Sequence, residues 1–312
     1  MERFTVTREQ AIAALRAMKA VAIADGTIGG HEVNLLQAAA RALEVEDALD
    51  CTPMKPIEVA AKVKDPIARL RVIQVMEMMV IIDGRVDPAE LAACEAFARA
   101  LGLDEPQLRS LRQLTRRNMR TLQLDLLRRR PIASPADVSR EHGAVRGLWR
   151  LGTASYGGAH DAAIAARYRH LGTLPEGTLG RAYCEHLTDR QFPFPGEHLG
   201  LPEELVRHDL AHVVSGYGTD VAGECETAAF SAALLKQDAF AHLFMVAVHT
   251  HLDLEVFPNE PSQAIFSLEP ERVIAALNRG LAVKRDLYDP AWDHWQEFPR
   301  PLADVRADLG LT

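Results

Sequence analysis

Apolar residues recur at helical spacing in both halves of the chain, and short polar or glycine-containing segments separate the apolar stretches. Within residues 106–130, Leu108, Leu111, Leu122 and Leu126 fall on one stripe of a helix. From about residue 140 onward Ala, Leu, Arg and Glu dominate, and long alternating runs of β-branched residues do not occur. The pattern therefore predicts an all-α protein.

The hydrophobic pattern of the first half occurs twice, with an offset of 58 residues. The segment AIADGTIGGHEVNLLQAAARALEV (22–45) aligns with VIIDGRVDPAELAACEAFARALGL (80–103). Each copy predicts a helix, a turn of the form D-G-x-[IV] and a second helix. The glycine suits the left-handed backbone conformation that ends a helix, and a glutamate in the first turn of the second helix complements the dipole of that helix.

Four acidic residues occupy matching positions in the two copies: Asp25, Glu32, Asp83 and Glu90. Their spacing matches part of an EF-hand calcium loop, but the loop positions that should supply the first oxygen ligands are apolar in both copies. Calcium binding in the EF-hand manner is therefore not expected. We interpret the four acids as turn and capping residues, because such residues mark helix ends.

The repeat is similar to the TerB-like (tellurite-resistance) helical domain over roughly residues 8–115. This resemblance implies a role in stress response, with metal contact or membrane proximity. It does not define a reaction.

The charge balance changes along the chain. Residues 1–130 hold 20 Lys and Arg against 18 Asp and Glu, whereas the remaining residues hold 15 against 25, which gives the net charge of −8. The change falls near PIASPAD (131–137), where two prolines lie among small residues. We therefore predict two helical domains, a TerB-like domain over 1–133 and a metal-binding domain over 134–312.

Several classes of protein are disfavoured by the sequence. No apolar run approaches the ~20 residues of a membrane span, and MERFTVTREQ lacks a signal-peptide core, so a cytoplasmic protein is expected. Nucleic acid is not an expected partner, because only residues 106–130 are strongly basic, with eight arginines and one acid, and aromatic residues make up 6%. That basic segment suits either an anionic membrane surface or the acidic half. The cysteines form no C-x-x-C pair and are interpreted as reduced core thiols: Cys51, Cys94, Cys184 and Cys225.

The stretch RHDLAHVVSGYGTDVAGECE (207–226) carries the candidate chemistry. His208 and His212 lie four residues apart, on one face of a helix that should end at Gly216. Asp209 lies about 100° around that helix and could bind a metal or orient a ligand histidine. Three glycines allow a reversal that would bring Glu224, at the start of the next helix, over the histidines. The result would be a nitrogen and oxygen site whose sequence does not select the metal.

Other interpretations of this stretch stay open at this point. The two acids could be helix-terminal charges. The zinc-peptidase motif HExxH requires Glu where this chain has Asp209. An HD-type phosphohydrolase would need an additional upstream histidine and a downstream aspartate, for which the candidates are His170 or His186 with Asp238 or Asp253.

The pattern H-D-x-x-H, eleven residues, then E is similar to the signature of the ubiquinone (coenzyme Q) biosynthesis protein four family. Two flanking blocks, LPEGTLGRAY (174–183) and LYDPAWDHWQEFPRPLADVRADLGL (287–311), resemble that family as well. The resemblance spans about residues 150–312 and implies that Zn²⁺ is held by His208, Asp209, His212 and Glu224, which are then also the candidate catalytic residues.

The resemblance further implies a peripheral protein at the inner membrane that binds a prenylated quinone precursor. It implies oxidative decarboxylation at ring carbon 1, or a scaffold for other quinone-biosynthesis enzymes. Zinc has no redox chemistry, so it would act as a Lewis acid; a redox ion such as Fe²⁺ is the alternative. A non-catalytic lipid-binding scaffold and a metal-dependent hydrolase remain alternatives, and the oligomeric state, including a homodimer, is open.

Apolar residues that follow Glu224 could form the wall of a lipid channel or the core of a helix pair. The small ones are Ala228, Ala229, Ala232 and Ala233, and the large ones downstream are Phe240, Phe244, Met245 and Val248.

Overall fold

The computed structural model describes most of the chain, and all of that part is helical or irregular. The described residues are 7–115, 161–198, 200–201, 203, 206–234, 239–252, 268–289 and 291–311. They form fourteen α-helices and two short 3₁₀ helices, with no strand, so the predicted all-α class is confirmed.

The chain divides into two compact units. The first contains residues 1–129 and 243–275, and the second contains residues 130–242 and 276–312. The proline-containing boundary near 131–137 lies outside the described residues, and the domain limits 1–133 and 134–312 stay a prediction.

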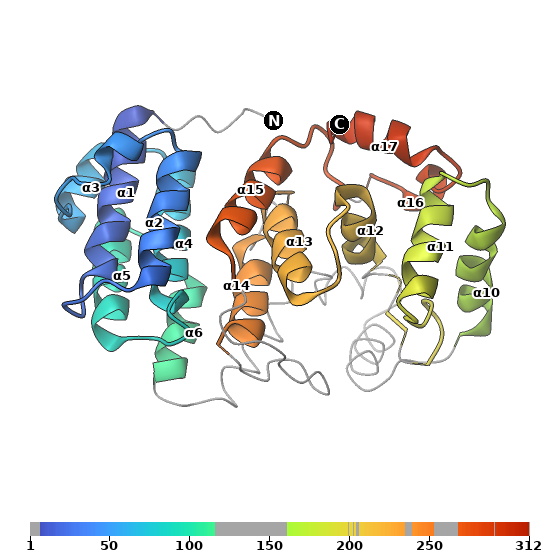
Figure 1. Ribbon diagram of the computed structural model, residues 1–312, viewed down its shortest axis with the longest axis horizontal. Helices are drawn as coiled ribbons and strands as arrows, with labels where there is room; N and C mark the ends of the chain where they lie inside the picture. Colours follow the sequence, from blue (N-terminus) through green and yellow to red (C-terminus); the bar gives the residue numbers. More distant parts are fainter. Residues whose placement is uncertain are drawn as a thin grey trace. The chain divides into compact units, whose positions relative to one another are not determined.

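The first unit is built around helix α1, which packs against α2, α3, α4 and α5 (Figure 1). Proline occupies the first position of α3, α4 and α5. The N–H group that proline lacks would have no acceptor within the helix at this position. Asp65 and Asp87 cap α4 and α5 by accepting from Ala68 N and Ala89 N. The helices span Arg8–Ala22 (α1), Gly30–Ala42 (α2), Pro56–Lys62 (α3), Pro66–Ile81 (α4), Pro88–Leu101 (α5) and Pro106–Thr115 (α6).

The predicted repeat is present as two helix–turn–helix pairs, α1 with α2 and α4 with α5. Gly26 and Gly84 have φ of 94° and 72°, as the left-handed ends predicted from the sequence require. Asp25 accepts from Thr27 N at 2.8 Å as a turn residue, and Glu32 Oε2 accepts from Gly29 N at 2.5 Å. The turn and capping interpretation is therefore right for the first copy.

Glu90 differs from that interpretation, because Asp87 caps α5 and Glu90 is instead buried, 5% exposed, near Glu32. Burial is the largest of the effects that raise the pKa of Glu90 to about 8, and the negative charges of Glu32 and Asp25 add to it. Burial likewise raises the pKa of Glu32. Carboxyl groups from the two copies of the repeat thus meet inside the unit, and the hydrogen bond between Glu32 and Glu90 favours the proton on Glu90.

A histidine joins the distant segment 243–275 to this unit. His251 is fully buried at the end of α14 (Ala239–Thr250). Its Nδ1 accepts from Leu268 N at 3.2 Å, so its Nε2 carries the hydrogen and donates to Ile82 O at 2.8 Å. Nothing in the local hydrophobic pattern indicates this long-range link.

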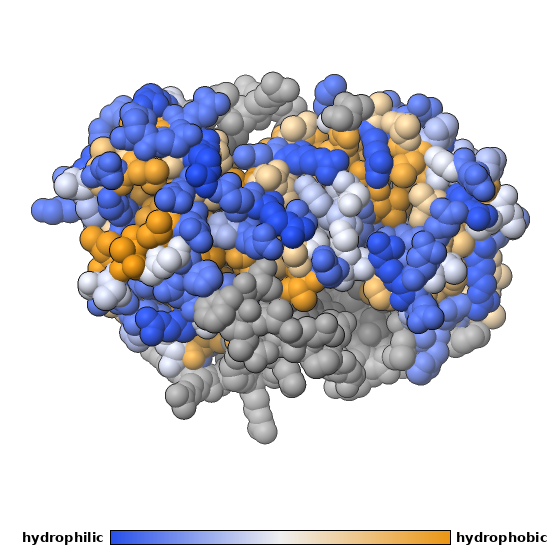
Figure 2. All heavy atoms as spheres, viewed as in Figure 1, coloured by the Kyte–Doolittle hydropathy of each residue, from blue (hydrophilic) through white to orange (hydrophobic). Residues whose placement is uncertain are grey.

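The surface of the first unit mixes polar and apolar side chains (Figure 2). The most exposed large apolar residues are Ile57, at 71%, and Ile67, at 55%. In the predicted basic segment, Leu108 and Leu111 are buried in α6, and residues 116–130 lie outside the described part of the chain.

The second unit surrounds helix α12, which packs against α11, α13 and α17 (Figure 1). An aromatic cluster of Tyr168, Tyr183, Trp295 and Phe298 joins α10, α11 and α16. The helices span Ala162–His170 (α10), Leu179–Asp189 (α11), Val206–Ser215 (α12), Val221–Leu234 (α13), Pro270–Leu281 (α15), His294–Glu297 (α16) and Leu302–Leu309 (α17). Of these, α15 contributes residues to both units.

The predicted channel residues that can be described belong to the packed interior. Ala228, Ala229 and Ala232 are fully buried in α13, and Phe240, Phe244 and Val248 are at most 5% exposed. A side chain at Gly280 of α15 would stand 2.4 Å from Phe230 O. The close approach at this point depends on Gly280 and Ala233, and the full burial of the other three alanines favours the core interpretation over a channel wall.

All four cysteines are free; Cys94 and Cys225 are buried, and Cys51 and Cys184 are half-buried. Within the described part of the chain, no helix combines the length and the apolar character needed to cross a membrane.

The raised pKa of Glu90 predicts that Glu90→Gln stabilises the protein in a pH-dependent way. The native state holds a proton on Glu90 up to about pH 8, whereas the unfolded chain loses it near 4.5, so stability falls as pH rises through this window. Gln carries no such charge. We expect a gain of about 1–2 kcal/mol at pH 9 and little change at pH 5, measured by urea unfolding.

The exposed Glu9, which pairs with Lys62 at 2.5 Å, supplies the matched control. Glu9→Gln should show no comparable increase with pH. An equal effect of Glu90→Gln at pH 5 and pH 9 would contradict the assignment.

Candidate metal centre

Two histidines and a glutamate from consecutive helices converge on one point. His208 Nε2 lies 3.3 Å from His212 Nε2 and 3.4 Å from Glu224 Oε2, and His212 Nε2 lies 3.4 Å from Glu224 Oε1. One potential ligand atom from each residue lies within 4.8 Å of the others. The sequence placed these three together, and the structure does bring them together.

These separations fit a single ion with tetrahedral geometry. A zinc ion sits about 2.0–2.1 Å from nitrogen and oxygen ligands, so neighbouring corners of its tetrahedron are about 3.3–3.4 Å apart. Each histidine Nε2 lies about one tetrahedral edge from the other Nε2 and from one oxygen of Glu224, although the two histidines face different oxygens, so the three residues can supply three corners of a tetrahedron. The fourth corner is left for a ligand from outside this group. The donors are nitrogen and oxygen without thiolate, a set compatible with zinc or iron.

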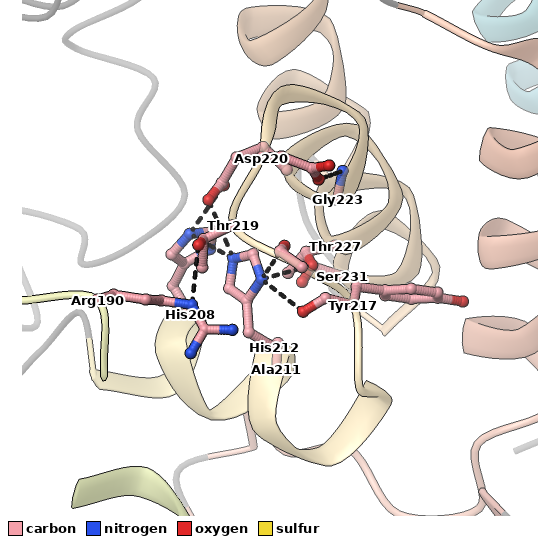
Figure 3. Close-up of polar contacts among 12 residues, drawn as sticks. Arg190, His208, Ala211, His212, Tyr217, Thr219, Asp220, Gly223, Thr227 and Ser231 are labelled. Carbon is pink, nitrogen blue, oxygen red and sulfur yellow. Dashed lines mark hydrogen bonds and ion pairs between the residues drawn. The ribbon is translucent and has the colours of Figure 1, made fainter. Parts of the chain in front are cut away.

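The ring of His212 is fixed by hydrogen bonds on its far nitrogen. Its Nδ1 lies 2.9 Å from Gly218 O and 3.0 Å from Thr227 Oγ1, and the residue is only 2% exposed. Because a carbonyl oxygen can only accept, Nδ1 carries the hydrogen, and the Nε2 lone pair points toward Glu224 and His208. Figure 3 shows His212 with Thr227 and Tyr217 on one side and His208 on the other.

The glycine-rich loop makes this arrangement possible. Gly216, with φ of 80°, ends α12 at the predicted position. The loop then turns back so closely that a side chain at Gly223 would stand 2.2 Å from Gly218 O. Glycine at position 223 therefore allows the carbonyl of Gly218 to lie between α13 and His212.

Helix α13 begins three residues earlier than the sequence predicted. Asp220 provides the cap, since its Oδ1 accepts from Gly223 N and its backbone O accepts from Glu224 N, both at 2.8 Å. Glu224 therefore does not cap α13, and its carboxylate faces the histidines. Burial raises the pKa of Glu224, but positive charge on the imidazoles of His208 and His212 outweighs this and lowers it, and a cation bound at their Nε2 atoms would act in the same direction.

Asp209, the fourth predicted site residue, lies outside the group of three. It is 5% exposed, and its Oδ2 accepts from Tyr183 OH at 3.3 Å. Burial raises the pKa of Asp209 to about 6. Burial and the neighbouring Asp209 also raise the pKa of Tyr183, which keeps the phenol protonated as a donor. This placement favours an indirect role for Asp209, which holds α12 and its two histidines against α11, over direct ligation.

His186, on α11, lies next to the group and was named from sequence only as a phosphohydrolase candidate. Its ring centroid is 5.7 Å from that of His212, and it is 8% exposed. Burial, together with the positive charge of Arg190, lowers its pKa to about 4. Of the other phosphohydrolase candidates, His170 is exposed at the end of α10, and Asp238 and Asp253 lie outside the described residues.

The flanking blocks that carry the family resemblance pack around the same helices. Leu179 N donates to Arg300 O at 2.9 Å, Gly180 N to Phe298 O at 2.9 Å, and Leu302 N to Gly177 O at 2.7 Å. Arg207, beside His208, donates to Tyr288 O at 2.8 Å. Segments far apart in sequence thus form one structural unit with α12.

Neither a comparison with models of known protein families nor one with curated proteins yields a match to this chain. What is established is therefore an all-helical protein with a His208–His212–Glu224 group suited to a metal ion.

Substitution of the three donors should remove metal binding. Glu224→Gln keeps the shape but removes the charge, and we expect affinity for Zn²⁺ to fall about 100-fold or more; His212→Ala should be at least as harmful. Asp209→Asn should cost about tenfold, as for a residue that orients a ligand. Competition with a chromophoric chelator measures the affinities.

Glu226→Gln is the matched control, because it changes the same charge on the same helix two residues away. If Glu224→Gln bound Zn²⁺ as tightly as Glu226→Gln, the three residues would not form a metal centre.

The close approach at Gly223 makes a second prediction. In Gly223→Ala the new methyl group must displace Gly218, so His212 loses its carbonyl partner, and Zn²⁺ affinity should fall about 10–100-fold. Gly30→Ala, where a methyl group meets nothing within 4 Å, is the control and should bind normally. Unchanged affinity in Gly223→Ala would show that the loop does not position the centre.

Proposed function

We propose that this chain is a metalloprotein of the ubiquinone-biosynthesis type, in which His208, His212 and Glu224 hold a divalent ion that binds a prenylated quinone precursor. The observation that carries the proposal is the convergence of the three residues: the two histidine Nε2 atoms lie 3.3 Å apart, and each lies 3.4 Å from one oxygen of Glu224. The H-D-x-x-H-eleven-E spacing and the two flanking blocks supply the ligand class by resemblance.

The residues present fit zinc, and Fe²⁺ is the alternative. A bound ion would supply Lewis-acid charge that stabilises a carboxylate or phenolate oxygen of the ligand. The chain supplies the rest: Glu224 provides negative charge, the Gly218 carbonyl fixes the tautomer of His212, and Asp209 with Tyr183 holds α12 against α11. These groups are set before a ligand arrives, which reduces the cost of ordering the site on binding.

The finer parts of the proposal rest on the resemblance alone. They are oxidative decarboxylation at ring carbon 1, contact with the inner-membrane surface and association with other quinone-biosynthesis enzymes. The alternatives are a lipid-binding scaffold in which the metal has a structural role, and a metal-dependent hydrolase. The three differ in what co-purifies with the protein and in what the protein converts.

Organic extraction of the full-length protein, followed by lipid mass spectrometry, tests the proposal. We expect a prenylated quinone or its precursor to co-purify with the wild type, together with about one metal ion per chain, and to be largely lost from Glu224→Gln. Glu226→Gln should retain both. The same lipid at equal levels in both variants would favour the scaffold.

A protein with no bound lipid that hydrolyses phosphate or carboxylate esters in a metal-dependent manner would contradict the proposal and support the hydrolase.

A further inference from the structure

The C-terminal end of helix α11 carries a histidine and an arginine whose side chains lie beside the candidate metal centre. His186 and Arg190 lie four residues apart, a spacing that places them on the same side of a helix. Helix α11 packs against α12, which carries His208 and His212 at the same spacing. Two pairs of residues thus lie on adjoining helices, but only the pair on α12 belongs to the group of potential metal ligands.

His186 places an unsatisfied nitrogen inside the protein. The residue is only 8% exposed, and its Nε2 is buried without a hydrogen-bond partner among the described residues. A buried nitrogen of this kind is costly to leave unpaired. Its neighbours are the rings of His212, at 5.7 Å, and Phe192, at 6.4 Å. A ligand that brought a polar atom to this nitrogen would remove that cost.

Arg190 brings a positive charge without a balancing carboxylate. Its guanidinium donates to Thr219 Oγ1 at 2.9 Å and to His186 O at 3.2 Å, and it forms no ion pair in the described part of the chain. Thr219 belongs to the loop that joins the two ligand-bearing helices, and Figure 3 shows Arg190 extending to it beside His208. By contrast, Arg169 and Arg181 of the same unit pair with glutamates.

We propose that His186 and Arg190 bind the carboxylate group of a ligand held at the open corner of the metal centre. This inference rests on the proposed function, because it requires the ion. A divalent ion with one ionised glutamate keeps a net positive charge, and Arg190 adds to it, so the site favours an anion. The positive charge of Arg190 attracts a carboxylate, and His186 Nε2 supplies a further hydrogen bond.

The simpler alternative is that Arg190 only holds the loop through Thr219. The two roles make different demands on the side chain. Anion binding needs the charge, whereas loop support needs the hydrogen bond from Nε, which lysine lacks. Arg190→Lys and Arg190→Gln therefore separate the two roles.

The full-length protein loaded with Co²⁺ provides the test, because the visible absorption of Co²⁺ changes when its open position is filled. Benzoate is the probe, and benzamide is its neutral counterpart. We expect saturable spectral changes with benzoate and much weaker ones with benzamide. Arg190→Gln should weaken benzoate binding about tenfold, and His186→Phe about threefold or more, while Co²⁺ affinity stays within about threefold of wild type.

Arg190→Lys should retain benzoate binding within about threefold of wild type. Arg169→Gln, which removes the same charge elsewhere in the unit, should leave it unchanged. Equal benzoate affinity in wild type, Arg190→Gln and His186→Phe would overturn the inference, as would a loss in Arg190→Lys as large as that in Arg190→Gln. Failure of the wild type to bind Co²⁺ would instead overturn the proposed function, and this inference with it.

Discussion

The position of one backbone carbonyl, that of Gly218, governs the geometry of the candidate centre. This oxygen accepts from His212 Nδ1 at 2.9 Å and lies where any side chain at position 223 would have to be. Because it fixes the tautomer of His212 and the approach of α13 together, it sets the ligand atom of one helix against the carboxylate of the next. This contact therefore helps to place His212 Nε2 3.4 Å from Glu224 Oε1.

Burial of ionisable groups has different origins in the two units. In the first unit, Glu32 and Glu90 come from matching positions of a repeated sequence, so the fold that brings the two copies together also brings their carboxyl groups together. In the second unit, a buried carboxylate, Asp209, faces the donor Tyr183. The first arrangement costs stability as the pH rises, whereas the second satisfies the buried group and fixes the spacing of two helices.

Local sequence signals were sufficient for the helix class, the ends at Gly26, Gly84 and Gly216, and the meeting of Glu224 with the two histidines. They were insufficient where the partner is distant or is part of the backbone. No side-chain pattern in the sequence predicts that the Gly218 carbonyl binds His212, and the link from His251 to Ile82 spans 169 residues. The start of α13 was placed at Glu224 because all three glycines were assigned to the reversal; Asp220 is the cap, and Gly223 already lies inside the helix.

A metal centre requires that the helix carrying its histidines has a fixed position relative to the other ligand. Both ends of α12 are anchored: Arg207 donates to Tyr288 O, and at the other end Arg306 donates to Val213 O and Val214 O at 2.9 Å, while Arg279 donates to Ser215 O at 2.6 Å. The bonds from Arg306 and Arg279 satisfy carbonyls that the end of a helix leaves unpaired. The anchoring arginines lie outside the motif, and most come from the C-terminal part of the chain. The motif therefore forms a site only together with the segments that hold its helix in place.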